Sequence, residues 1–285
     1  INVTYENKEF ILKKKIDMIP SVYDLKSSIT YMPSSYHIYT EYNYKISDDG
    51  LRILKNGIDK FTGFDKIKFP CLLKSVHCKG KFIWFQFDNF TMWNTLGMSG
   101  QWGFIKEKHS HQEFIVKGGR NFFFTDTRCF GTLKFCFSNE ELKKKLDTIG
   151  PSWLENLEVE DFFHIFRKKS QKMNVCKFLM NQRYTSGIGN YLLSEILYAS
   201  KINPWVTLRE VSNSEIIKIY ENACRIAMSS YLSNGVSIRT YKGIYEDEGE
   251  YTFELLAYGQ KDDPNIVAEL GPHNRTIWWD PNVQK

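Results

Sequence analysis

The stretch that decides the fold runs from residue 175 to residue 205 and reads VCKFLMNQRYTSGIGNYLLSEILYASKINPW. Gly187 and Gly189 mark a tight turn between two predicted helices, and Asn190 stands at the start of the second helix. Pro204 follows the end of that helix, as expected of a residue that stops it. The apolar face of the second helix repeats with a period of about 3.6 and comprises Leu192, Leu193, Ile196 and Leu197.

The glycine turn at 187–189 has two interpretations on physical grounds alone. Two glycines allow the backbone to approach a ligand closely, and the N-terminus of the following helix presents free N–H groups that suit a phosphate. The alternative is an ordinary corner between two helices, in which Gly187 and Gly189 serve only the turn. Because a Gly-x-Gly pattern is weak by itself, both interpretations stay open at this level.

The composition is that of a globular chain long enough for two domains. The sequence has 285 residues, of which 42% are hydrophobic and 25% are charged. The formal net charge of +5 favours an anionic partner without requiring one. We expect no membrane partner, because the chain contains neither an uninterrupted apolar run of about 18 residues nor the apolar core of a signal peptide at its start.

The cysteines indicate a reducing compartment. The six cysteines form no C-x-x-C pair, which argues against a zinc ribbon and against a redox-active pair. Free thiols are typical of an intracellular protein. We therefore expect no cofactor and no metal from the cysteine pattern.

The first half of the chain predicts mainly strands. A short helical pattern covers residues 1–12, and a second, amphipathic helix is predicted from Asp49 to Phe61 in a region that is otherwise hard to interpret. Aromatic and apolar runs with polar or glycine-containing breaks follow between residues 80 and 136. The strands predicted there are 81–87, 91–94, 113–116 and 121–124. Such a series is typical of a β-sandwich or barrel.

The second half predicts helices and then a return to extended structure. Gly150-Pro151 marks the break between the two textures, and helical patterns run from 158 to 233. Extended structure is predicted for 251–285. The plan is a β-rich domain followed by a helical domain that ends in a β-hairpin.

Six short motifs are spread along the chain. They are CKGKFIWF (78–85), TLGMSGQW (95–102), FTDTRCFG (124–131), QRYTSGIGNYLLSEIL (182–197), YGQKDDP (258–264) and NRTIWWDPNVQK (274–285). In this order they resemble the formamidopyrimidine-DNA glycosylase / endonuclease VIII family of base-excision repair enzymes. Each motif is weak alone, but together they keep the family's order and span nearly the whole chain.

The resemblance implies an α+β fold, with an N-terminal β-sandwich domain and a C-terminal helix-two-turn-helix domain that carries a finger-like β-hairpin. We expect the sandwich over 1–148, with an insertion around 30–62, and the helix-two-turn-helix domain over 149–250. The finger is expected over 251–285.

The resemblance assigns the opening stretch to DNA binding. It implies that Asn190 and the amides near Gly187 and Gly189 contact a DNA phosphate, as does Arg275 in the finger. Glu195 matches a glutamate near the damaged nucleotide, although a capping or surface carboxylate is the alternative. A solvated hairpin arginine is the corresponding alternative for Arg275.

One position departs from the family pattern. Cys176 stands where the family usually has a lysine that contacts phosphate. The neighbouring Lys172 or Lys177 is a candidate to replace that contact.

Met98, Arg128 and Phe130 match the family's three void-filling residues. An enzyme that works on a base in duplex DNA extrudes that base, and side chains fill the gap left in the stack. An apolar wedge replaces lost stacking, and an arginine can hydrogen-bond the widowed base. Without the resemblance, core packing is the usual interpretation of Met98 and Phe130.

Two further assignments come from the resemblance. Lys81 matches a lysine that contacts phosphate beside the lesion and supports catalysis; a solvated lysine at the start of a strand is the alternative. Residues 235–251 resemble the loop that covers the extruded base, with Ser237, Arg239 and Tyr241 as candidates.

The catalytic pair of the family is not found in this sequence. Members use the amine of the mature N-terminal residue as nucleophile and the next residue, a glutamate, as acid and base. Ile1 aligns just after that pair. We expect the pair to lie upstream of this numbering; a truncated or inactive relative is the alternative.

The finger departs from the zinc-binding members. Their four cysteines align with Asn265, Ala268, Asp280 and Val283, none of which supplies a thiolate. The finger is therefore similar to the zincless finger of some eukaryotic and large-DNA-virus endonuclease VIII-like enzymes. Apolar packing is expected to replace the metal, through Ile277, Trp278 and Trp279. We interpret the remaining candidates for metal ligation as surface histidines, namely His109, His111 and His273.

The resemblance thus implies a bifunctional DNA glycosylase and abasic-site lyase of the endonuclease VIII-like type, which removes oxidised bases, with oxidised pyrimidines and hydantoins ahead of 8-oxoguanine. The expected partner is duplex DNA with damaged bases or abasic sites, bound by a monomer in the nucleus or a viral replication compartment. The first alternative is a catalytically inactive protein that binds damaged DNA. The second is an RNA-binding helix-two-turn-helix protein of the ribosomal kind, which predicts no β-sandwich and no wedge residues.

Overall fold

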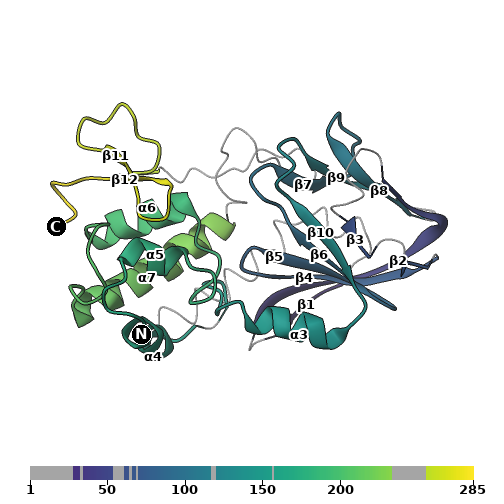
Figure 1. Ribbon diagram of the computed structural model, residues 1–285, viewed down its shortest axis with the longest axis horizontal. Coiled ribbons are helices and arrows are strands. Elements are labelled where there is room, and N and C mark those ends of the chain that lie inside the picture. Colours follow the sequence, from purple (N-terminus) through teal and green to yellow (C-terminus); the bar gives the residue numbers. More distant parts are fainter. Residues whose placement is uncertain are drawn as a thin grey trace. The chain divides into compact units, whose positions relative to one another are not determined.

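The computed structural model describes residues 28–32, 35–53, 61–63, 66–68, 70–116, 120–155, 157–232 and 255–285. The chain divides into two compact units, one containing His37–Lys144 and the other Lys145–Ser233 with Thr252–Lys285 (Figure 1). The helix predicted over 1–12 and the predicted base-covering residues Ser237, Arg239 and Tyr241 lie outside the described residues.

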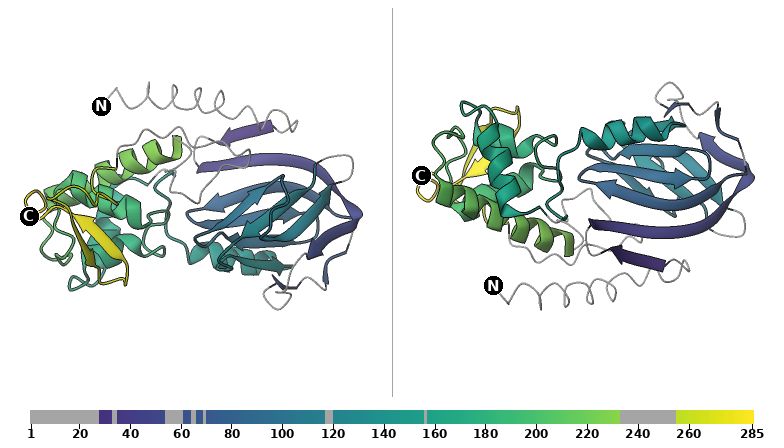
Figure 2. Two further views of the ribbon diagram at one scale, coloured as in Figure 1. Left: turned by 90° about the horizontal axis from the view of Figure 1, so that it is seen from above. Right: turned by 90° about the horizontal axis from the view of Figure 1, so that it is seen from below.

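The first unit is built from strands (Figures 1 and 2). Ten described strands are connected in the order β3-β10-β6-β5-β4-β2-β8-β9-β7, with β1 paired to β2. Their bounds are β1 (Ser28–Met32), β2 (Ser35–Ile53), β3 (Phe61–Thr62), β4 (Leu72–Lys79), β5 (Phe82–Phe87), β6 (Thr91–Thr95), β7 (Gly100–Gly103), β8 (Ser110–Val116), β9 (Phe122–Asp126) and β10 (Thr132–Cys136).

The strands form two sheets that share β2. The first sheet contains β3, β10, β6, β5 and β4, and the second contains β8, β9 and β7. The first half of β2 pairs antiparallel with β4, where Thr40 is opposite Val76. Its second half pairs antiparallel with β8, where Leu51 is opposite Phe114. The register shifts within both pairings, as in a strand that bends between two sheets.

The amphipathic helix predicted from Asp49 to Phe61 is wrong over its first residues. Residues up to Ile53 continue β2, and Phe61 begins β3. The ladder to β8 supplies backbone hydrogen bonds that override the local pattern. Part of the expected insertion around 30–62 is thus β1 and β2, which pair within the sheet.

The core of the first unit lies between the two sheets. Phe87 and Met92, from the first sheet, are completely buried, and Phe114, from the second, is 1% exposed. The rings of Phe87 and Phe114 stack with centroids 6.1 Å apart, and Phe85 contacts Trp102 at 4.9 Å. The predicted β-sandwich is confirmed by this packing of aromatic rings from both sheets.

The second unit is built from helices. The bounds of the described helices are α4 (Val159–Lys168), α5 (Val175–Met180), α6 (Asn190–Ser200) and α7 (Asn213–Leu232), while α3 (Asn139–Asp147) lies where the chain passes from one unit to the other. The predicted helix, turn and second helix are confirmed as α5, a glycine turn and α6. No described helix is both long and apolar enough to cross a bilayer.

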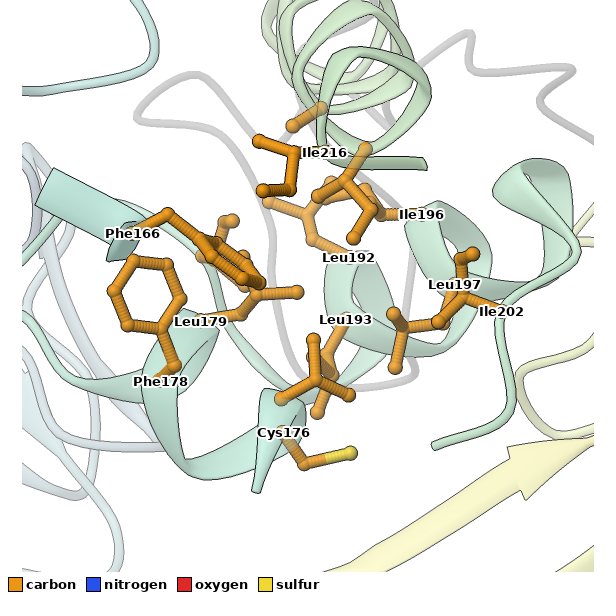
Figure 3. Close-up of a cluster of buried hydrophobic side chains, with 14 of the residues drawn as sticks. Phe166, Cys176, Phe178, Leu179, Leu192, Leu193, Ile196, Leu197, Ile202 and Ile216 are labelled. Atoms are coloured by element: carbon orange, nitrogen blue, oxygen red, sulfur yellow. The ribbon is translucent and has the colours of Figure 1, made fainter. Parts of the chain in front are cut away.

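The apolar face predicted for α6 forms the centre of the helical core (Figure 3). Leu193, Ile196 and Leu197 are completely buried. They pack with Phe178 and Leu179 of α5 in one cluster. The cluster holds the two helices on either side of the turn in place.

The finger is a hairpin of β11 (Val267–Leu270) and β12 (Thr276–Trp279). Ile277 is completely buried, Trp279 is 9% exposed, and both belong to the helical core. The indole of Trp279 packs edge-on against Trp205 at 6.4 Å. Trp278 lies outside the core but packs against Tyr258 at the same centroid distance of 6.4 Å. The expected apolar packing of the finger is therefore present.

Candidate nucleic-acid interface

The structure brings the three predicted wedge residues together on two loops of the sandwich. Met98 is 39% exposed and Phe130 is 57% exposed, so the core-packing interpretation is wrong for both. The Arg128 guanidinium lies 4.0 Å from the Met98 sulfur and 5.2 Å from the Phe130 ring centroid. The cluster offers an apolar surface and a cation at one place. We call Met98, Arg128 and Phe130 the wedge cluster.

A buried carboxylate that the sequence analysis missed joins the two loops. Asp126 is 1% exposed and accepts a hydrogen bond from the Ser99 hydroxyl at 2.5 Å. It also accepts from the backbone N–H of Arg128 at 3.2 Å and of Gly131 at 2.6 Å. The Ser99 oxygen in turn accepts from the Arg128 N–H at 3.0 Å. The neighbours of Met98 and Phe130 are thereby tied to one side chain.

The two loops also touch directly at a glycine. Gly97 has a φ of +66°, and a Cβ there would lie 2.9 Å from the Phe130 carbonyl carbon. Both the backbone conformation and the contact exclude a larger residue. The sequence signal for this contact is the glycine directly before Met98.

The start of α6 is tied to the finger through Asn190. The Asn190 Nδ2 donates to the Thr276 carbonyl at 2.7 Å, and its Oδ1 lies 3.2 Å from Nε2 of His273. Gly187 has a φ of +110° with open space where a Cβ would be. Gly189 precedes the helix in an extended conformation. Within the turn, the Gly187 N–H donates to Oε1 of Gln182 at 2.9 Å, and Nε2 of Gln182 donates to the Ile188 carbonyl at 3.0 Å.

The finger turn presents Arg275 to solvent. Its side chain is exposed and forms no hydrogen bond with the part of the chain that the structure describes. The Gly271 N–H donates to the Arg275 carbonyl at 2.8 Å, which closes the turn. A fixed backbone with an exposed guanidinium suits an anionic ligand.

The prediction that His273 is a surface histidine is wrong. It is half-buried and contacts Asn190, and burial followed by the charge of Arg275 lowers its pKa. His109 and His111 are also only partly exposed, and the His111 Nε2 lies 2.8 Å from the Asp126 carbonyl. In the described ranges, no group of three or more His, Cys, Asp or Glu side chains could hold a metal.

Glu195 is an internal anchor. It is 2% exposed, so the surface alternative is wrong. Its carboxylate accepts hydrogen bonds from the backbone N–H groups of Leu256, Ala257 and Tyr258, at 2.9, 3.0 and 2.7 Å. A carboxylate with this many donors fixes the entry to the finger. The predicted role of Glu195 beside DNA stays a prediction.

Cys176 is completely buried, and its thiol donates to the Pro204 carbonyl at 3.0 Å. Burial raises the pKa of this thiol far above its usual value. Its side chain therefore does not reach the surface. The exposed Lys172 and Lys177 lie on either side of it in sequence. They line one open depression of about 350 Å³, together with Ser170, Met173, Asn174 and Pro272.

Two further predicted residues are Lys81 and Arg239. Lys81 is exposed in the turn between β4 and β5. Arg239 lies outside the described residues. The structure therefore defines a wedge cluster in the first unit, and in the second it places Asn190 at the start of α6 and the exposed Arg275 in the finger turn.

Two parts of the chain match domains of a known protein family. Residues 71–133 match the formamidopyrimidine-DNA glycosylase N-terminal domain, and residues 149–242 match the formamidopyrimidine-DNA glycosylase H2TH domain. A formamidopyrimidine-DNA glycosylase of Mycoplasma mobile is 32% identical over 198 residues, which cover 67% of this chain and 71% of the relative. The chain belongs to the formamidopyrimidine-DNA glycosylase family. A relative from Lactobacillus johnsonii is 28% identical over 82% of this chain and 87% of its own length.

Solved structures of this family share the fold. One is a complex between the Lactococcus lactis Fpg and DNA containing an abasic site, with 22% identity and a TM-score of 0.73 over 85% of this chain and 93% of that one. Another is the MutM (Fpg) protein of Thermus thermophilus, with 18% identity and a TM-score of 0.74 over 85% and 92%. The fold class predicted from the sequence is confirmed, and the predicted enzyme class, a DNA glycosylase, is that of the formamidopyrimidine-DNA glycosylase family.

Proposed function

We propose that the full-length product of this chain binds duplex DNA as a monomer, removes oxidised bases and cleaves the abasic strand. The observation that carries this proposal is the wedge cluster, in which Met98, Arg128 and Phe130 are all exposed and Arg128 contacts the other two. Apolar side chains and an arginine are needed to fill the gap where a base leaves the stack. Because Met98 and Phe130 are exposed, a role in core packing does not account for them.

Phosphate contacts would come from the helical unit. Asn190 and Arg275 present an amide and a guanidinium, and Gly187 leaves open space where a side chain would stand. Lys172 and Lys177 add positive charge in place of the buried Cys176. Lys81 is proposed to contact phosphate beside the lesion and to support catalysis, and Arg239 to contact the extruded base.

The proposed chemistry uses the amine of the mature N-terminal residue. The neutral amine attacks C1′ of the nucleotide and expels the base, and loss of the ring oxygen bond gives a Schiff base. A glutamate next to the amine would transfer the protons. Elimination then breaks the strand, and hydrolysis returns the amine. The terminal amine suits this role because its usual pKa of about 8 leaves a neutral fraction at physiological pH.

The resemblance to zincless endonuclease VIII-like members supports oxidised pyrimidines and hydantoins as preferred substrates, with 8-oxoguanine behind them. The same resemblance supports a nucleus or a viral replication compartment as the place of action. A panel of duplexes, each with one of these bases, tests the preference directly. Faster release of 8-oxoguanine than of every pyrimidine lesion would contradict it.

Borohydride trapping tests the lyase proposal. The full-length product is incubated with a duplex carrying an abasic site, and borohydride reduces the Schiff base to a stable secondary amine. We expect a covalent protein–DNA adduct, absent with an undamaged duplex. Tight binding to the abasic duplex without any adduct would instead identify an inactive protein that binds damaged DNA.

A further inference from the structure

The amide of Asn190 has its orientation fixed by the finger. Its Nδ2 lies 2.7 Å from the Thr276 carbonyl, which can only accept a hydrogen bond, so the amide nitrogen must face Thr276. The Oδ1 must then face His273, whose Nε2 is 3.2 Å away. An amide oxygen can only accept, so Nε2 of His273 carries a proton.

The state of the imidazole follows from its surroundings. Its other nitrogen, Nδ1, is buried and has no hydrogen-bond partner among the described residues. Burial and the charge of Arg275 both lower the pKa of His273, which favours the neutral ring. The ring therefore has one N–H, and that N–H is used on Asn190.

A glycine makes room for this ring. A Cβ at Gly271 would lie 2.7 Å from Cε1 and Nδ1 of His273 and 2.5 Å from Cδ1 of Ile277. The same glycine closes the turn, because its N–H donates to the Arg275 carbonyl and its carbonyl accepts from Asn274 at 3.0 Å. One tight turn thus places both the imidazole and the Arg275 backbone.

We infer that His273 is a positioning residue for DNA binding: it holds the Asn190 amide so that the second Nδ2 hydrogen faces a DNA phosphate. This inference rests on the proposed function, in which Asn190 and Arg275 contact phosphate. Through His273 and Thr276, the finger sets the direction of a donor on α6. One turn thereby orients the Asn190 amide and fixes the Arg275 backbone before DNA binds.

A double-mutant cycle tests the inference. Binding is measured to a duplex carrying a reduced abasic site, which cannot form a Schiff base, for His273→Leu, Asn190→Ala and the double variant. We expect His273→Leu to weaken binding about threefold to tenfold, the range of one hydrogen bond. In the Asn190→Ala background the same change should weaken binding no further.

Three companion variants separate positioning from a general structural effect. His273→Gln retains a side-chain N–H donor and is expected to restore binding to within about twofold of the wild type. Gly271→Ala keeps the imidazole but displaces it, so it should reproduce the loss even where His273→Leu fails to fold. His164→Leu, an exposed histidine on α4, is the matched control and should bind like the wild type.

The outcomes are distinguishable from failure of the proposed function. If the wild type does not prefer the abasic duplex over undamaged DNA, the proposed function fails. If the wild type prefers it and Asn190→Ala weakens binding, but His273→Leu does not, only the role of His273 is overturned. Equal losses from His273→Leu in both backgrounds would also overturn it, since they would show an effect independent of Asn190.

Discussion

The wedge cluster and the finger are both proposed to meet DNA, but they are held in opposite ways. The wedge side chains Met98 and Phe130 are exposed, and a polar network around the buried Asp126 holds their loops. The finger instead places Ile277 and Trp279 in the helical core and leaves Arg275 outside. In the wedge cluster, the side chains proposed to meet DNA do not contribute to the core. In the finger, by contrast, burial of the strand that follows Arg275 holds the whole hairpin in place.

The two regions differ in the secondary structure that supports them. A two-stranded hairpin is marginal by itself, and residues 255–285, which include the finger, contain no cysteine that could clamp it through a metal or a disulfide. Burial of β12 takes the place of such a clamp, helped by Gln284, which donates to the Ile202 carbonyl at 2.9 Å and accepts from the Asp280 N–H at 2.8 Å. The wedge loops already extend from paired strands, so one carboxylate suffices to align them.

The largest expected effect is from Ile277→Ala. Removing a completely buried side chain from the core should lower the free energy of unfolding by about 2–5 kcal/mol, measured by denaturant titration. Leu270→Ala is the matched control, because Leu270 is 71% exposed on the partner strand and its loss should change stability by less than about 0.5 kcal/mol.

The same titration distinguishes packing from a metal clamp. A chelator should leave the midpoint of the wild type unchanged if apolar packing holds the finger. A fall in the midpoint with chelator, or a loss with Ile277→Ala no larger than with Leu270→Ala, would contradict the comparison drawn above.

The second effect concerns the carboxylate under the wedge. In Asp126→Asn, one amide N–H must face a donor, either the Gly131 N–H or the pair formed by Ser99 and Arg128. We expect a loss of about 1–3 kcal/mol in unfolding free energy, together with weaker binding to abasic DNA. Asp88→Asn is the control, since Asp88 is exposed and its substitute still accepts from the Asn89 N–H. An Asp126→Asn protein with normal stability and normal binding would remove Asp126 from the support of the wedge.

Local patterns predicted the parts of the molecule that are built from local interactions. The period of apolar residues along 190–200 and the glycines before it predicted the turn and α6. The bend of β2 could not be predicted in this way, because it depends on pairing with two strands far along the chain. The amphipathic pattern after Asp49 even predicted a helix where the sheet imposes a strand.

The candidate site shows the same division. The resemblance identified the wedge residues. Only the three-dimensional structure shows that Met98 and Phe130 are exposed and that Arg128 contacts both. The polar supports Asp126, Glu195 and His273 each act on partners brought close by folding, as Glu195 does on the backbone of 256–258. Side-chain hydrogen bonds to distant segments leave no periodic signal, so a single sequence does not reveal them.

A third test separates function from packing in the wedge cluster. Phe130→Ala and Met98→Ala should each change the unfolding free energy by less than about 0.5 kcal/mol, because both side chains are exposed. Binding to abasic DNA should weaken by about 1–3 kcal/mol for Phe130→Ala, the range for a lost contact between an aromatic ring and a base. Equal binding to undamaged DNA by variant and wild type completes the expected pattern. A variant that lost stability instead would place Phe130 in the packing of its loop.

The smallest expected effect concerns two lysines of the helical unit and the salt dependence of DNA binding. Lys172 and Lys177 are exposed around one open depression, while Cys176 between them is buried. If each lysine meets one phosphate, Lys172→Gln and Lys177→Gln should each reduce the slope of log affinity against log salt by about 0.9. Lys218→Gln on α7 is the control for an exposed lysine outside this depression and should leave the slope unchanged. Because the contact is electrostatic, lesion preference should be the same in all variants. A slope that stayed at the wild-type value in both would mean that the family's phosphate contact disappeared with the lysine, and that Asn190 and Arg275 hold the backbone without it.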